Sequence, residues 1–285
     1  MSNQIKTVVL LTVLSVLFIY IGKALAGQQG MVIAFVFALI MNFVSYWFSS
    51  KIVLTLYRAT PVPEDHEVYQ LVREVATAAR APMPKVYRIP SMSPNAFATG
   101  RNPQNGVIAV SEGLLRILNA EELKGVLSHE MSHIVNRDTF ISAIAATIAS
   151  SIVMLANMAK WAAIFGGHRR DENGRGSGAL ELLAMAIVAP IAATLIQLAI
   201  SRSREFQADQ RGAGIARNPY GLISALQKIS QASKEVPLEF ATPATSHLFI
   251  VNPLGWGLLT KLFGTHPPLE ERIQRLRNLR PHGSS

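Results

Sequence analysis

The chain of 285 residues contains no cysteine. This absence excludes disulfide bonds and every thiolate metal site, so His, Asp and Glu side chains are left as the metal ligands that the sequence offers. A chain without cysteine also fits a reducing compartment. Any metal chemistry is therefore expected to use imidazole and carboxylate groups.

Charge is also scarce, because charged residues make up 16% of the chain and apolar residues 49%. In an average soluble domain about a quarter of the residues are charged. The apolar residues gather in long runs, which indicates membrane segments beside a soluble part. The net charge is +9, but the sequence shows no basic helix with interleaved aromatics, zinc finger or single-strand-binding signature. We therefore expect a lipid bilayer, and no nucleic acid, as a partner.

Four apolar runs occur in two pairs. The first pair covers residues 7–26 and 31–48, and the "GQQG" between them is typical of a tight turn. Each run approaches the length that crosses a bilayer, and a cleaved signal peptide would not be followed by a second run. Residues 1–50 are therefore expected to form a transmembrane hairpin. The second pair is rich in Ala and Ser, so residues 139–200 are expected to form a second apolar hairpin, either transmembrane or re-entrant.

The remaining parts, residues 51–138 and 201–285, have the patterns of one soluble domain in two pieces. Asn119 with Glu122 three residues later forms a capping box that starts a helix. After residue 200 we expect a helix, a break at "RNPYG", another helix, and an amphipathic helix opened by the prolines of "THPPLEERIQRLRNL". Apolar spacing predicts two earlier helices, at 67–81 and 111–118. Apolar residues between turn residues predict three short strands, at 85–90, 95–100 and 107–110. The expected fold class is mainly α with a small β-sheet.

The helix that starts at Asn119 carries "HEMSH", residues 129–133. Residues four apart lie on one face of a helix, so His129 and His133 can direct both imidazoles at one ion. Glu130 lies about 100° around the helix from His129, where a general base can act on a water molecule without binding the metal. The pattern is typical of zinc peptidases. Two surface histidines that share a helix face remain the alternative.

A catalytic zinc needs a third protein ligand and an open position. The extended motif HExxHxxGxxH is excluded because Asn136 and Thr139 stand where its Gly and third His should be. A carboxylate on a later helix is the other option, and we choose Glu205 in "SRSREFQAD"; a solvated charge beside two arginines is the alternative. Asp209, one turn further on, can accept the free ring N–H of His129.

The apolar runs also constrain the topology. Two crossings, or one re-entrant hairpin, between His133 and Glu205 return the chain to the side that it left, so both residues can share one site. Both stand within a few residues of the second hairpin, which places the site at or near the bilayer surface. Of the 27 Lys and Arg residues, 22 fall on the side of the catalytic domain, which favours a cytoplasmic orientation.

With these motifs in place, the chain resembles the HtpX heat-shock proteases, membrane zinc endopeptidases related to the CAAX prenyl proteases. The resemblance covers nearly the whole chain, since "NAFATG", "LSHEMSHIVNRD", "SRSREFQAD" and "THPPLEERI" occur in the order of that family. It implies a zincin-like catalytic domain in a multi-span protein of the bacterial cytoplasmic (inner) membrane. One Zn²⁺ would be held by His129, His133 and Glu205, with Glu130 as the catalytic base. It also implies stress-related quality control of membrane proteins.

Two further roles follow from the resemblance. Related proteases pair an edge strand near the zinc with extended substrate, which here would involve Asn95, Ala96 and Phe97; an ordinary sheet strand is the alternative. His266 would stabilise the developing oxyanion of the scissile carbonyl, unless it only belongs to a helix start that contains proline.

The sequence therefore predicts a membrane-bound zinc endopeptidase that hydrolyses peptide bonds of unfolded or damaged membrane proteins. A processing peptidase that acts on one kind of tail is an alternative within the class. A non-cleaving metal-binding membrane scaffold is an alternative outside it, and Glu130 beside the three ligands argues against that scaffold. The sequence gives no oligomeric state.

Overall fold

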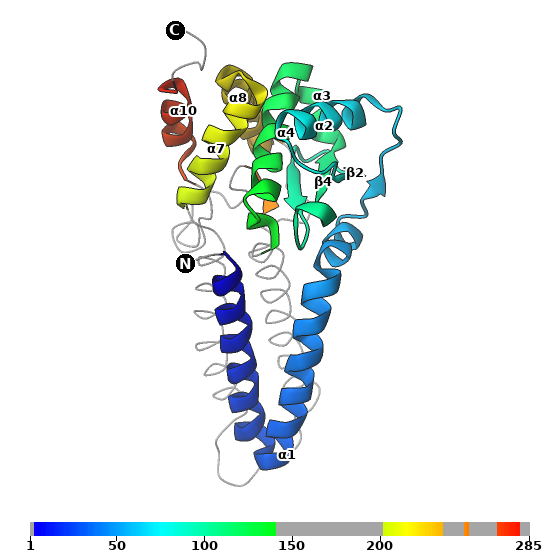
Figure 1. The fold of residues 1–285 in the computed structure, drawn as a ribbon, viewed down its shortest axis with the longest axis vertical. Helices are drawn as coiled ribbons and strands as arrows, with labels where there is room; N and C mark the ends of the chain where they lie inside the picture. The colour runs from blue at the N-terminus through cyan, green and yellow to red at the C-terminus, as the bar shows by residue number, and fades with distance from the viewer. Residues whose placement is uncertain (1–2, 141–201, 236–247, 251–266, 280–285) are drawn as a thin grey trace.

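The computed structural model describes residues 3–140, 202–235, 248–250 and 267–279. His266 and residues 141–200 of the expected second hairpin lie outside these ranges. The described part is mostly helical with one four-stranded mixed sheet, so the predicted fold class, mainly α with a small sheet, is confirmed. Figure 1 shows the sheet and most of the helices at one end of the molecule, with helix α1 (Asn3–Leu56) extending away from them.

Helix α1 spans 54 residues and folds back on itself (Figure 1). Gly27 has a φ of 59°, a conformation that glycine adopts without a steric penalty. The two limbs touch, because Asn42 Nδ2 donates to Ser15 Oγ at 2.9 Å and the rings of Phe18 and Phe37 meet edge to face at 5.5 Å. In a straight helix Ser15 and Asn42 would lie about 40 Å apart. The chain therefore reverses near Gly27.

Among the described residues, α1 is the one helix whose length and composition would let it cross a membrane. Its most apolar window, Gly27–Val44, has a mean hydropathy of 1.7, and only 11% of the window is buried within the molecule. Large apolar side chains face outward along this limb, among them Ile33, Phe35, Leu39 and Phe43. The multi-span architecture expected from the sequence stays a prediction.

Three aromatic residues join the second limb of α1 to the chain that follows helix α4 (Ala120–Val135). The Tyr46 ring lies 5.4 Å from the Trp47 ring and 5.2 Å from the Phe140 ring. The Arg101 guanidinium lies 4.3 Å above the Trp47 ring. We call Tyr46, Trp47 and Phe140 the aromatic collar. Aromatic rings beside a cation at the end of an apolar helix are typical of a membrane–water boundary.

The sheet consists of β1 (Thr60–Pro61), β2 (Lys85–Ile89), β3 (Ala96–Thr99) and β4 (Val107–Ser111), in the order β1-β2-β4-β3. Strands β2 and β4 are parallel, and the other two pairs are antiparallel. The three strands predicted from the sequence are confirmed, whereas β1 was missed because two residues carry no alternating pattern. The order places β3 at one edge of the sheet.

Within the described ranges, six α-helices accompany the sheet: α2 (Glu67–Ala78), α3 (Glu112–Ile117), α4, α7 (Arg202–Ala216), α8 (Pro219–Glu235) and α10 (Leu269–Arg277). Helix α4 is central, since it packs against α7 and α8 and also against β3 and β4. Residues 125–132 are all buried, and Val126 and Met131 share one apolar core with Ile108 of β4. This packing puts the HEMSH segment inside the domain, which excludes the interpretation as two surface histidines.

Candidate metal centre

A capping box fixes the start of helix α4, as the sequence predicted. Asn119 Oδ1 accepts a hydrogen bond from the Glu122 N–H, and Glu122 Oε2 accepts one from the Asn119 N–H, both at 2.9 Å. Glu122 also accepts hydrogen bonds from Ser224 and Lys228 of α8 at 2.7 and 2.8 Å. Burial raises the pKa of Glu122, but the bonds from Lys228 and Ser224 outweigh burial and leave this pKa below its ordinary value. The box thus holds α4 to α8 as well as starting the helix.

Two glycines let α4 cross its neighbours at short range. A Cβ atom at Gly212 of α7 would lie 2.9 Å from the backbone N and Cα of His129, and one at Gly125 would lie 2.6 Å from a backbone nitrogen of α8. These separations are shorter than van der Waals contact, so glycine alone fits at both crossings. The close approach at His129 brings Glu205 and Asp209, from the first half of α7, next to the histidines of α4.

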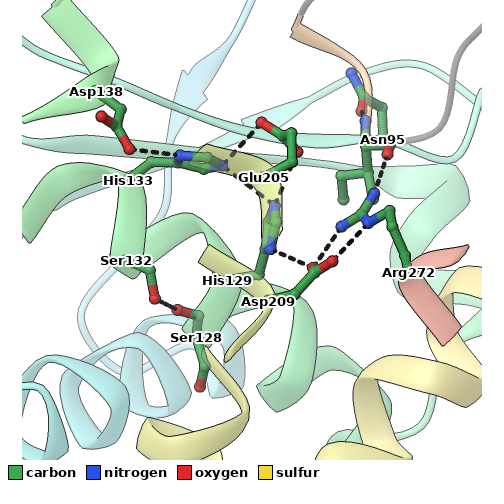
Figure 2. Close-up of polar contacts among 10 residues, drawn as sticks. Asn95, Ser128, His129, Ser132, His133, Asp138, Glu205, Asp209 and Arg272 are labelled. Atoms are coloured by element: carbon green, nitrogen blue, oxygen red, sulfur yellow. Dashed lines mark hydrogen bonds and ion pairs between the residues drawn. The ribbon is translucent and has the colours of Figure 1, made fainter. Parts of the chain in front are cut away.

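Three side chains converge at this crossing (Figure 2). The Nε2 atoms of His129 and His133 lie 3.2 Å apart. Glu205 places Oε2 3.7 Å from His129 Nε2 and Oε1 3.6 Å from His133 Nε2. One possible ligand atom from each residue lies within 4.8 Å of the others. Ligand atoms around a tetrahedral zinc are about 3.3 Å apart, so the spacing matches a single small cation.

Each imidazole also faces a carboxylate through its other nitrogen. His129 Nδ1 lies 2.9 Å from Asp209 Oδ1, and His133 Nδ1 lies 3.3 Å from Asp138 Oδ2. A carboxylate at Nδ1 favours the proton on that nitrogen, which leaves Nε2 of each ring free to bind a metal. The contact expected between Asp209 and His129 is present in the structure.

Asp209 is bound in turn by Arg272 of α10 (Figure 2). The Nε and Nη2 atoms of Arg272 donate to Oδ2 and Oδ1 of Asp209 at 2.8 and 2.7 Å, and Nη1 donates to the Ile250 carbonyl at 2.9 Å. Arg272 is 1% exposed and Asp209 2%. Burial raises the pKa of Asp209, but Arg272 and His129 outweigh burial and lower this pKa to about 2. Asp209 is therefore ionised at neutral pH.

Glu130 is buried on the side of α4 that faces strand β3. Its carboxylate accepts a hydrogen bond from the backbone N–H of Ala98. Burial raises the pKa of Glu130 above its ordinary value, the nearby imidazoles of His129 and His133 oppose the rise, and the charge of Glu205 adds to it. A group that takes up and releases a proton near neutral pH needs a pKa raised in this way.

Negative charge exceeds positive charge in the described centre. Burial lowers the pKa of His133, but the charges of Glu205, Asp138 and Glu130 outweigh burial and raise this pKa to about 9. The centre contains four buried carboxylates but only two buried guanidinium groups among the described residues. The carboxylates belong to Glu130, Asp138, Glu205 and Asp209, and the guanidinium groups to Arg204 and Arg272. A divalent cation between the two imidazoles and Glu205 would balance this excess. Both the donor set and the charge therefore fit a metal such as zinc.

The outer edge of β3 lies beside Glu130. The Asn95 carbonyl accepts from the Ser111 N–H at 2.9 Å, so the alternation of an antiparallel pair turns the backbone groups of Ala96 and Ala98 away from β4. The Ala98 N–H bonds to Glu130. Within the described ranges no strand pairs with this edge.

The side chains of Asn95 and Phe97 are engaged within the protein. The Phe97 ring is 2% exposed and lies 5.1 Å from the Tyr57 ring. Asn95 Nδ2 donates to the Leu248 carbonyl at 3.1 Å, and Asn95 Oδ1 accepts from the Ile250 N–H at 3.2 Å. A peptide that binds beside β3 would therefore contact the backbone of the strand and not the side chains of Asn95 and Phe97. His266, the remaining candidate, lies outside the described residues.

Two residues of the centre were missed by sequence reasoning. Asp138 lies in the same stretch as the HEMSH segment, but a carboxylate five residues after a histidine carries no signal at helical spacing. Arg272 does carry a signal, because it stands on the apolar face of α10 beside Leu269, Ile273 and Leu276. A charged residue on such a face needs a buried partner.

Comparison with known proteins identifies the class that this fold and site define. The model of peptidase family M48 matches residues 63–280, which include α4, α7 and α10. The chain belongs to peptidase family M48, a family of metallopeptidases.

Similar proteins bear the name expected from the resemblance. The protease HtpX homolog of Syntrophobacter fumaroxidans is 55% identical over 282 residues, which cover 98% of this chain and 100% of that protein. The protease HtpX homolog of Pyrococcus furiosus is 51% identical over 277 residues, which cover 96% of this chain and 95% of that protein. The predicted resemblance to the HtpX proteases is thereby confirmed.

The crystal structure of S. mikatae Ste24p has a similar fold, with a TM-score of 0.51 and 19% sequence identity. The match covers 96% of this chain and 65% of that chain, so this chain spans just under two thirds of the length of Ste24p. Together with the apolar helix α1, the HtpX relatives and this fold indicate a membrane protein.

Proposed function

We propose that the chain is a membrane-bound zinc endopeptidase. His129, His133 and Glu205 would hold one Zn²⁺, Asp209 would orient His129, and Glu130 would be the general base. The observation that carries this proposal is the convergence of two imidazole nitrogens and one carboxylate beside a buried Glu130 that faces the strand edge. Membership of a metallopeptidase family supports peptide bonds as the substrate.

The residues of the centre divide the work of hydrolysis between them. When bound, zinc supplies a positive charge that polarises a peptide carbonyl and lowers the pKa of a water molecule. Glu130 takes the proton from the attacking water and passes it to the leaving amine, and its raised pKa suits both transfers. The Ala98 N–H holds the carboxylate of Glu130 beside β3. Asp209 and Asp138 keep each Nε2 turned into the site.

The proposed substrates are extended segments of unfolded or damaged membrane proteins. Such a segment would add to the outer edge of β3 along Asn95, Ala96 and Phe97, where the outward backbone groups of Ala96 would form main-chain hydrogen bonds that do not demand a particular sequence. The far end of β3 touches the proposed membrane hairpin, because Thr99 Oγ1 lies 3.5 Å from Ser50 Oγ of α1. This contact supports the entry of a substrate segment from the membrane. His266 would stabilise the oxyanion, and His266→Ala should then lower kcat more than it changes KM.

Replacing Glu130 with Gln tests the general base. The variant should bind zinc as tightly as the unmutated chain and lose about 10²–10⁴-fold in kcat for an unfolded protein substrate, because the amide cannot accept the proton. Glu121→Gln, the same substitution at an exposed position of α4, is the matched control and should keep full activity. Proteolysis by purified Glu130→Gln at the unmutated rate would remove the mechanism.

Replacing Glu205 with Ala tests the third ligand. Metal analysis of the purified, unmutated chain should give about one zinc per chain, and Glu205→Ala should bind zinc far more weakly because two imidazoles alone remain. Glu235→Ala, at an exposed position of α8, should retain the metal. Equal zinc affinity in Glu205→Ala and the unmutated chain would exclude Glu205 as a ligand.

The proposed domain layout places residues 1–50 and 139–200 in the membrane and residues 51–138 and 201–285 in a catalytic domain in the cytoplasm of a bacterial cell. The chain has no cysteine, so Asn173→Cys introduces a single thiol between the two later apolar runs. If the second hairpin spans the bilayer, an impermeant thiol reagent added to intact cells should label this residue. Labelling only after the cells are opened would mean that the hairpin does not span.

A further inference from the structure

The described part of the chain contains a continuous set of polar contacts that runs from His129 of α4 to the start of strand β3. His129 Nδ1 contacts Asp209, which accepts two hydrogen bonds from Arg272. The third donor of Arg272 binds the Ile250 carbonyl, and the Ile250 N–H donates to Asn95. Figure 2 shows Arg272 between Asp209 and Asn95.

Arg272 is suited to this position by its geometry. A guanidinium group offers donors in a fixed planar fork, so one side chain can bind both oxygens of a carboxylate and a carbonyl in a defined direction. Arg272 uses three of its nitrogens in this way while it is 1% exposed. A lysine ammonium is a compact point charge and cannot reproduce the fork.

Asn95 completes the set of contacts on the side of the strand. Its side-chain amide bonds to the Leu248 carbonyl and to the Ile250 N–H, and its backbone bonds to Ser111 of β4 in both directions. The short segment 248–250 is therefore held between α10 and the residue that precedes β3. A shift of Arg272 would be felt both at Asp209 and at the start of β3.

We propose that Arg272 is a positioning residue that couples two functions of the site. Through Asp209, it orients His129 toward a metal. Through Ile250 and Asn95, it places strand β3. This inference rests on the proposed function, in which His129 binds zinc and β3 binds the peptide. It assigns Asn95 to positioning the strand rather than to contacting the peptide with its side chain.

The test measures zinc affinity by competition with a chromophoric chelator, and kcat and KM with an unfolded protein substrate, in the full-length purified chain. Arg272→Gln should weaken zinc binding about 10- to 100-fold, the usual effect of removing the partner of a metal-binding histidine, and should also raise KM. Asp209→Asn should reproduce the loss of zinc affinity alone, and Asn95→Ala the rise in KM alone. Arg277→Gln removes the same charge from an exposed position of α10 and should change neither.

A purely structural Arg272 would give a different pattern. Arg272→Gln would then unfold at a lower temperature but show unchanged zinc affinity and KM in its folded fraction, and this result would overturn the proposal. If Arg272→Gln does not fold, the two partner variants decide: unchanged zinc affinity in Asp209→Asn, or unchanged KM in Asn95→Ala, overturns the coupling. Failure of the unmutated chain to bind zinc or to cleave peptides would instead refute the proposed function.

Discussion

His129 and His133 share a helix face but differ in their surroundings. His129 is 2% exposed and is held by Asp209, whose charge is already bound by Arg272. His133 is nearer the surface, and the carboxylates around it, at Asp138, Glu205 and Glu130, raise its pKa to about 9 despite burial. In the metal-free protein His133 therefore carries a proton at neutral pH. Because a metal ligand must be a neutral imidazole, zinc bound by His133 would have to displace that proton.

Zinc binding should therefore release about one proton per chain at pH 7.5. Calorimetric titration of the metal-free protein with zinc, in two buffers with different ionisation enthalpies, measures this number directly. The released fraction should fall as the pH rises through about 9, the raised pKa of His133. A proton release near zero at pH 7.5 would contradict the charge arrangement described for His133.

The same pKa predicts how the stability of the metal-free protein depends on pH. A pKa that is higher in the folded state than in the unfolded state stabilises the fold below the unfolded value of about 6.5, and this stabilisation is lost as the pH rises through the folded value. His133 has a folded pKa of about 9. The unfolding temperature of the metal-free protein in detergent should thus fall between about pH 6.5 and pH 9, and saturating zinc should remove this dependence.

Helix α4 is the fixed framework of the site, because contacts hold it in place at several points along its length. The capping box and Lys228 fix its start, Gly125 fixes its crossing with α8, and Gly212 fixes its crossing with α7 at His129. The separation of α4 and α7 decides whether Glu205 can reach the two imidazoles. Backbone contacts at the glycines therefore set the geometry of the candidate metal centre.

Gly212→Ala should disturb this crossing, whereas Gly214→Ala on the same helix should not. The new methyl group at Gly212 would lie 2.9 Å from the His129 backbone, while a methyl group at Gly214 meets nothing within 4 Å. We expect Gly212→Ala to cost about 1–3 kcal/mol through overpacking and to weaken zinc binding. Gly214→Ala should be neutral or stabilising by up to about 1 kcal/mol, because Ala favours a helix over Gly. Equal stability and zinc affinity of the two variants would exclude a tight crossing.

Glu122→Gln tests the fixation of α4 at its start. The pKa of Glu122 is lowered in the fold, so its contribution to stability is present above its ordinary pKa of 4.5 and is lost as the pH falls through the lowered value. At pH 7 the variant should be less stable by about 1–3 kcal/mol, with little from the ion pair because Lys228 is 45% exposed. Below about pH 4 the difference should shrink. Denaturation in detergent measures it, with Glu121→Gln as the control.

At the scale of the whole molecule, an apolar hairpin meets the part of the chain that holds the candidate metal centre at the aromatic collar. The outward apolar face of α1 includes Trp47, where Arg101 lies over the ring, and Phe140 brings the chain after α4 to the same level. Thr139 Oγ1 donates to the Gly100 carbonyl at 2.9 Å, so the end of β3 reaches this level as well. A bilayer surface at the collar would bring the open strand edge close to the lipid.

Trp47 should therefore lie at the bilayer boundary. In a chain with Trp161→Phe and Trp256→Phe, which leaves Trp47 as the single tryptophan, lipids brominated close to the headgroup should quench its fluorescence more than lipids brominated near the chain ends. The control moves the tryptophan to the outward-facing position 35 of α1, by adding Phe35→Trp and Trp47→Phe, and should show the reverse order. Equal quenching of Trp47 at both depths would exclude this placement.

Much of the fold could be predicted because its signals are local. The capping box at Asn119, the break between α7 and α8 and the start of α10 after Pro268 each depend on a few neighbouring residues whose backbone preferences read directly from the sequence. The HEMSH spacing similarly fixes that two imidazoles share one face of a helix. Glu205 needed an argument about topology as well, and the structure brings it to the two histidines.

Apart from the two-residue strand β1, the sequence by itself thus determined the described helices and strands, the apolar runs and the residue types that are available to hold a metal, since these follow from periodicity and composition. Only the tertiary structure decided that β3 forms the edge of the sheet, that Asn95 binds segment 248–250, and that Asp138 and Arg272 complete the surroundings of the histidines. The physical reason is that these contacts join residues whose approach is set by the packing of whole elements, above all at the glycine crossings of α4. No pattern within one segment encodes the distance between two packed elements.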